Sequence, residues 1–175
     1  MSKLWIPNTS PLILLNKIDH LHLLTELSET LIIPRAVIDE LLMNQEGQIQ
    51  FDTFLSSEKV RILKEYLRGH QEVAGWDLGK GESEVISQAI NNPGCEVILD
   101  DLQARKCAQT FNIAVRGTVG IILLAKKKNL IPEATPLVRS LINAGLRFEK
   151  HWITKALELI DERFDNDNEI TGEIV

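Results

Sequence analysis

The chain has 175 residues, of which 44% are hydrophobic and 25% are charged. This length and composition predict one globular domain with a sizeable core and exclude a disordered or fibrous protein. The formal net charge of −6 argues against a general nucleic-acid coating protein, which needs a basic surface, but not against a nuclease that holds cations with carboxylates.

The cysteines and the apolar segments indicate where the protein works. Cys95 and Cys107 lie far apart and belong to no CxxC or Cys/His cluster, so neither a disulfide framework nor a structural zinc site is predicted. No apolar run approaches the roughly 20 residues that span a bilayer, and the N-terminus lacks a basic region followed by an apolar signal core. We therefore expect a cytoplasmic protein with no membrane contact.

Short apolar runs alternate with helical patterns in the first half of the chain. Residues 4–6 and 31–33 are predicted strands, each followed by a proline. A helix is expected from about Pro11, with Thr9 or Ser10 as its cap. Further helices are expected over 20–27, from Pro34 onward and over 51–55, with a strand over 60–63. The segment that continues to Trp76 shows no clear period.

The same alternation continues in the second half. Gly79-Lys80-Gly81 is predicted to break the chain before a strongly amphipathic helix. Strands are expected over 96–99 and 113–115, and helices over 102–110, 117–128, 133–144 and 149–163. This order predicts right-handed crossovers and a mostly parallel sheet. The polar tail 165–175 is expected to be frayed.

Polar side chains recur just after strands or near the start of the next helix, where ligands bind in an open parallel sheet. Asn8 follows the first strand, Glu40 lies on the helix after the second, and Glu82 opens the helix that follows Gly81. Asp100 and Asp101 follow the strand over 96–99. Several oxygen ligands at one edge of a sheet would suit magnesium or manganese.

These acidic residues also have structural interpretations. Asp100 and Asp101 are equally consistent with a helix N-cap and a first-turn charge. Glu40 borders an apolar helix face, and an exposed salt bridge remains its alternative.

Glu82 and Glu84 compete for one position, because residues two apart on a helix face different ways. The positions three, four and seven after Glu82 are apolar, whereas those after Glu84 are Ser87, Gln88 and Asn91. The helical phase therefore predicts that Glu82 points toward the sheet as a ligand. Glu84 is expected to face solvent or to support a ligand from behind.

Other chemistries find little support in the sequence. The histidines at positions 20, 22, 70 and 151 show no metal-binding spacing, and Ser10 has no GxSxG context. The glycines at 79 and 81 precede no phosphate-cradling pattern and are interpreted as turn residues.

Several short motifs in a fixed order connect the chain to a known family. They are Asn8-Thr9-Ser10-Pro11-Leu12, Ile33-Pro34 leading to Asp39-Glu40-Leu41, Gly81-Glu82-Ser83-Glu84, Leu99-Asp100-Asp101 with Arg105, Arg116-Gly117-Thr118-Val119-Gly120, and Leu123-Leu124-Ala125-Lys126. From Asn8 to about Leu146 the chain resembles PIN-domain proteins, particularly a prokaryotic group described as predicted nucleic-acid-binding proteins.

The resemblance implies a three-layer α/β/α fold with a mostly parallel sheet and extra C-terminal helices. It implies a PIN-like domain over residues 1–146, a C-terminal helix over 147–164 packed on that domain, and a disordered tail over 165–175. It also implies metal-dependent cleavage of RNA, often as the toxin of a toxin–antitoxin pair. The expected cofactor is magnesium or manganese, and the expected partners are RNA, an antitoxin protein and a homodimer partner.

The resemblance also assigns roles to individual residues. Glu40, Glu82 and Asp100 match three acidic positions of the PIN site, and Thr118 matches a hydroxyl near it. Asn8 stands where the family has its first aspartate, so it supplies no charge, and Asp101 could compensate as a further ligand.

Basic residues near the site have two interpretations. Arg105 or Arg116 could hold the phosphate backbone, with an ordinary salt bridge as the alternative for either. Residues 126–128 are a lysine run that suits a solvated helix end or an RNA contact.

The neutral side chain of Asn8 leaves other functions open. One is a catalytically silent module that binds nucleic acid or a partner without cutting, and another is a phosphatase or small-molecule site in the same acidic pocket.

Overall fold

A computed structural model describes residues 4–43, 48–67, 69–147 and 150–163 of the chain. In these residues a parallel sheet has the strand order β3-β2-β1-β4-β5. The strands are β1 (Leu4–Pro7), β2 (Thr30–Ile33), β3 (Val60–Ile62), β4 (Glu96–Ile98) and β5 (Ala114–Arg116). The predicted α/β class with a parallel sheet is therefore confirmed.

The central strand β1 pairs with β2 on one side and with β4 on the other. Trp5 is in register with Leu31 of β2 and with Glu96 of β4. Trp5 and Ile6 are fully buried, as expected for a parallel sheet that helices cover on both faces. Because all strands run the same way, their carboxyl ends share one edge, and the chain changes direction across the sheet between β1 and β4.

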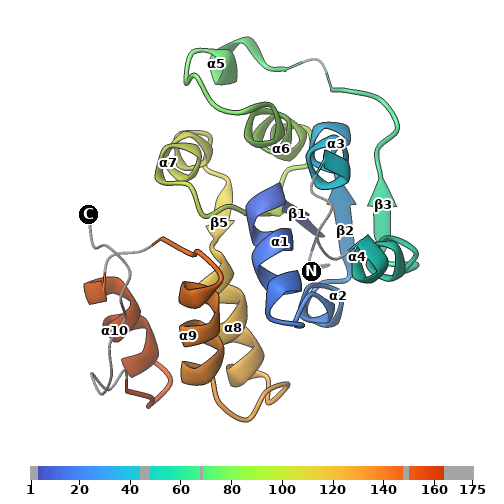
Figure 1. The fold of residues 1–175 in the computed structure, drawn as a ribbon. Helices are drawn as coiled ribbons and strands as arrows, with labels where there is room; N and C mark the ends of the chain where they lie inside the picture. Colours follow the sequence, from blue (N-terminus) through green and yellow to red (C-terminus); the bar gives the residue numbers. More distant parts are fainter. Residues whose placement is uncertain (1–3, 44–47, 68, 148–149, 164–175) are drawn as a thin grey trace.

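Helices flank this sheet (Figure 1). They are α1 (Thr9–Lys17), α2 (His22–Leu27), α3 (Arg35–Met43), α4 (Gln48–Leu55), α5 (Gln71–Ala74), α6 (Lys80–Ile90), α7 (Leu102–Thr110), α8 (Thr118–Lys127), α9 (Thr135–Asn143) and α10 (Lys150–Glu158). In Figure 1, α8 and α9 lie side by side below β5, with α10 at their left, and α3 and α6 are neighbours at the upper end. None of the helices in the described part of the chain is long and apolar enough to span a bilayer.

Several boundaries differ from the sequence-based expectation. The first helix begins at Thr9 and not near Pro11, so Asn8 occupies the N-cap position, where its side chain makes no capping bond. Helix α6 begins at Lys80, so Gly81 lies inside the helix and is not a turn residue. The segment without a clear period contains the short helix α5. The predicted frayed tail lies outside the described residues.

Candidate functional site

Asn8 is the first polar residue after β1, and its position is fixed by the sheet. Its backbone N–H donates to the carbonyl of Ile98 at the end of β4, with an N···O distance of 3.0 Å. The side chain is only 7% exposed. Its Oδ1 atom is buried and has no hydrogen-bond partner among the described residues. Such orphaned acceptors are rare in native proteins, because an unpaired buried carbonyl loses its hydration without compensation.

The carboxylate of Glu40 lies next to this orphaned oxygen. Its Oε1 accepts from the backbone N–H of Gly81 at 3.0 Å, and its Oε2 accepts from the hydroxyl of Thr9. A Cβ atom added to Gly81 would lie 2.8 Å from each Glu40 oxygen and 2.9 Å from Asn8 Oδ1. Three oxygens, from the β1–α1 junction and from α3, therefore approach Gly81 so closely that a side chain at this position would collide with them.

Glu82 adds a second acidic side chain near Gly81. Its carboxylate accepts from the N–H of Gly79 at 3.1 Å and so caps α6. Partial burial raises the pKa of Glu82 above its usual range, and the negative charges of Asp101 and Glu40 raise it further, against the opposing effect of the Gly79 bond. The charges of both acids therefore act on Glu82, but Glu82 is only partly buried and caps its own helix, whereas the prediction placed it toward the sheet.

Asp100 lies at the end of β4 and binds the start of α8. Its Oδ1 accepts from the backbone N–H of Thr118 at 2.7 Å, and its Oδ2 accepts from the Thr118 hydroxyl at 2.6 Å. Burial raises the pKa of Asp100, although the Thr118 bonds and the charge of Arg105 act in the opposite direction. Thr118, expected as a hydroxyl near the site, thus touches an acidic site residue directly.

Asp101 is a helix N-cap, the structural role that the sequence offered as the alternative to a metal ligand. Its Oδ1 accepts from the N–H groups of Gln103 and Ala104, both at 2.8 Å, so it is the N-cap of α7. Its carboxylate still contributes negative charge at Glu82.

The two arginines differ in their distance from the acids. Arg105 donates to the carbonyl of Leu99 at 2.9 Å and lies near Asp100. Arg116 forms a salt bridge with Glu96 at 2.8 Å, and its guanidinium lies 5.8 Å from the centre of the Trp5 ring. Arg116 therefore makes the salt bridge that was its alternative role, and Arg105 is the better candidate for a phosphate contact.

The expectation that Glu84 could face solvent is wrong, because Glu84 is only 5% exposed. Its Oε2 accepts from the N–H of Ala36 and its Oε1 from the N–H of Leu67, both at 2.6 Å. Ser87, one turn later, accepts from the N–H of His70. The segment between β3 and α5, which has no readable period, thus covers the helix face that the sequence assigned to solvent.

The two most informative additions to the predicted site are Thr9 and Gly81. Thr9 was interpreted only as a helix cap, and Gly81 only as a turn residue. Their signal in the sequence is weak. It consists of a threonine beside Asn8 directly after a strand, and of a glycine beside Glu82 where the helix begins.

The side chains offer the oxygen atoms that a hard divalent cation prefers. These oxygens do not, however, all surround one position where an ion could sit. Asn8 Oδ1 and the Glu40 carboxylate offer oxygen ligands in one space, and Glu82 and Asp100 carry carboxylates whose charge burial disfavours. A cation would offset that cost. Within the described residues, however, no three Asp, Glu, His or Cys side chains are grouped closely enough to hold an ion.

Comparison with known proteins identifies the family of the chain. A family model described as a PIN domain matches residues 4–162, which is most of the chain. No curated protein gives a significant match. The family match, the parallel sheet and the polar residues at its carboxyl edge lead to one conclusion, that the chain belongs to the PIN-domain family.

Proposed function

We propose that the chain is a metal-dependent ribonuclease that hydrolyses phosphodiester bonds at the carboxyl edge of its sheet. The observation that carries the proposal is the orphaned oxygen of Asn8, which faces the Glu40 carboxylate across Gly81. An unpaired amide oxygen beside a carboxylate is well suited to a cation, although both oxygens of Glu40 also accept hydrogen bonds from the protein. The family match supports a nuclease fold.

In this proposal each residue has a defined task. Glu40, Glu82 and Asp100 would hold magnesium or manganese if their carboxylates moved closer together than they are in this structure, and Asn8 would orient water or substrate with its neutral oxygen. A bound cation of this kind activates water and offsets charge on the phosphate oxygens. The bonds from Gly81 and Thr9 fix Glu40, and those from Thr118 fix Asp100. Arg105 is placed to contact the phosphate backbone of the substrate.

A second candidate function is a PIN module that binds RNA or a homodimer partner without cutting. Two observations favour it: position 8 carries asparagine where the family has an aspartate, and both oxygens of Asp100 already accept bonds from Thr118. Fewer free charges at the site reduce its affinity for a divalent cation.

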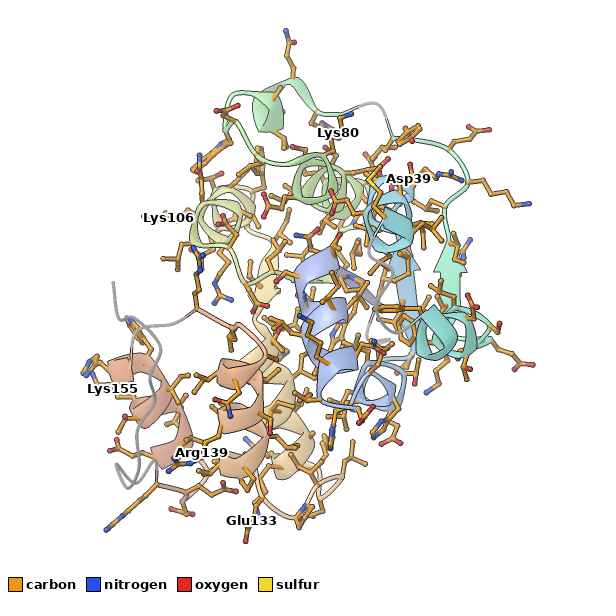
Figure 2. The ribbon with its side chains drawn as sticks, in the orientation of Figure 1. Asp39, Lys80, Lys106, Glu133, Arg139 and Lys155 are labelled. Carbon is orange, nitrogen blue, oxygen red and sulfur yellow. The ribbon has the colours of Figure 1, made fainter. Side chains whose placement is uncertain are left out.

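The test is cleavage of a mixed RNA substrate by the pure chain with manganese, with magnesium and with a chelator. We expect weak cleavage that requires one of the two ions. Glu40→Gln should lower it by about tenfold or more, a typical loss when the surroundings of a metal are disturbed. Glu133→Gln is the matched control, because Glu133 is exposed and lies at the lower end of the molecule, far from Lys80 on α6 (Figure 2). Cleavage that persists in chelator would refute the mechanism, and RNA binding without cleavage would favour the second function.

We further propose that the ribonuclease acts as the toxin of a toxin–antitoxin pair, with the antitoxin protein as its partner. The neighbouring gene tests this. A short upstream reading frame with a DNA-binding head and an amphipathic tail would support the proposal, and its absence would contradict it.

A further inference from the structure

Glu84 is a buried carboxylate that the proposed mechanism does not use. Both of its oxygens are bound by backbone N–H groups, one from Ala36 in the first turn of α3 and one from Leu67 in the segment before α5. A buried carboxylate with two such donors is a strong connection, because charge-assisted hydrogen bonds are about twice as strong as neutral ones. Glu84 therefore ties α6 to two other parts of the chain at once.

The bond between Glu84 and α3 has a reciprocal counterpart. Glu84 of α6 accepts from Ala36 at the start of α3, and Glu40 of α3 accepts from Gly81 at the start of α6. The two helices are in contact and run in opposite directions, since the later residue on one meets the earlier residue on the other. Glu40 follows Ala36 by four residues, which is about 6 Å along a helix axis. Two carboxylates thus fasten the same pair of helices about one turn apart.

We propose that Glu84 is a positioning residue for the candidate site. By holding the first turn of α3 against α6, Glu84 sets the rotation of α3 about its own axis and the position of α3 along α6. That rotation and that position decide where the Glu40 carboxylate meets Gly81 and Asn8. An effect of Glu84 on activity rests on the proposed function, in which Glu40 is a metal ligand. The effect of Glu84 on the position of the Glu40 side chain does not depend on that function. If Glu84 is lost, α3 keeps its apolar packing but loses one of the two polar bonds that hold it to α6.

The experiment compares Glu84→Gln with the parent by amide hydrogen exchange. A glutamine has the same size, but its amide NH₂ would face one of the two N–H donors, so only one of the bonds can remain. We expect the Gly81 amide, which donates to Glu40, to exchange about tenfold faster than in the parent after correction for global stability. The amide of Val97 in the buried strand β4 supplies that correction.

Glu162→Gln is the matched control. Glu162, which follows α10 in the chain, also joins distant segments, because its carboxylate accepts from the backbone N–H groups of Ala134 and Thr135. These two bonds lie at the start of α9 and not between α3 and α6. Both variants should unfold at lower temperature than the parent, whereas only Glu84→Gln should change the corrected exchange of Gly81. Equal corrected exchange in both variants, or parent-like exchange in Glu84→Gln, would overturn the proposal. If Glu84→Gln does not fold, Glu84→Asp keeps the charge and is measured in the same way.

Manganese calorimetry separates this proposal from the proposed function. If the parent binds manganese, Glu84→Gln should bind it about tenfold more weakly, as expected when the surroundings of a ligand are disturbed, and Glu162→Gln should bind it as the parent does. If manganese does not bind the parent, the proposed function fails, while the exchange of Gly81 still decides whether Glu84 positions Glu40.

Discussion

Replacement of Gly81 by alanine directly tests the geometry of the site. The added methyl carbon would lie 2.8 Å from both Glu40 oxygens and 2.9 Å from Asn8 Oδ1, which is far inside van der Waals contact. The backbone of α6 is held by its helical bonds, so the side chains must move instead. Glu40 is the more mobile of the two, because its carboxylate is the end of a long side chain. We therefore expect Gly81→Ala to push Glu40 out of the space it shares with Asn8.

Two opposing effects set the change in stability. Alanine stabilises a helix interior by about 1 kcal/mol relative to glycine. Loss of the hydrogen bond from the Gly81 N–H to the Glu40 carboxylate costs about 1.5–3 kcal/mol, because its acceptor is charged. The net loss is about 0.5–2 kcal/mol, which for a chain of this size lowers Tm by about 1–8 °C. Manganese affinity should fall by about tenfold or more, because a proposed ligand is displaced.

Thermal unfolding and manganese calorimetry measure both effects, with Gly75→Ala as the control. A Cβ at Gly75 would meet nothing closer than the Glu72 carbonyl at 3.7 Å, an ordinary contact. That variant should change stability by less than about 0.5 kcal/mol and leave manganese binding unchanged. If Gly81→Ala kept the Tm and the manganese affinity of the parent, our description of the space between Asn8 and Glu40 would be wrong.

Two further substitutions test the charges of the site. Asn8→Asp places a negative charge at a buried position beside Glu40, so the variant should have a lower Tm than the parent without metal. It should bind manganese more tightly in calorimetry and gain more in Tm when the ion is added; equal or weaker binding would place Asn8 outside the site. Glu82→Gln removes a carboxyl group whose pKa is raised in the folded state by burial. The ionised group therefore destabilises the folded state at a pH above that pKa, and this destabilisation is lost as the pH falls and the group is protonated. The variant should therefore match or exceed the parent in Tm at neutral pH, with a smaller difference in acid, while it binds manganese more weakly; a drop in Tm that is larger at neutral pH than in acid would contradict this assignment.

The alternation of strands and helices was readable because each element carries its own local pattern. The buried strand after Gly94 and the helix after Asp100 are bounded by turn and capping residues, and both occur where expected. The order of the strands was not predicted, because pairing depends on contacts between segments far apart in the chain. Placing Asn8 and Asp100 near one edge needed only the parallel sheet, since the residues that follow neighbouring parallel strands share that edge.

The burial of Glu84 could not be predicted, because helical phase shows which residues share a face but not what covers that face. The apolar residues Val85, Ile86 and Ala89 correctly marked a core-facing side of α6. The face with Glu84 and Ser87 is also covered, by a segment that binds through its backbone N–H groups. Backbone donors are present in every sequence, so such a segment leaves no side-chain pattern that could reveal it.

The unpartnered oxygen of Asn8 is the feature that sequence reasoning could least provide, and it is also the strongest reason to regard this edge as a site. A fold selected for stability alone would place a donor against a buried acceptor, because an unpaired one costs about 1–3 kcal/mol. Here the neighbours of Asn8 Oδ1 are two carboxylate oxygens that already have donors of their own, Gly81 and Thr9. The same arrangement requires glycine at position 81, since any side chain there would fill the space. An acceptor that the fold leaves without a donor costs free energy unless a cation or a substrate donor pairs with it, and for this reason we propose that Asn8, although uncharged, belongs to the site.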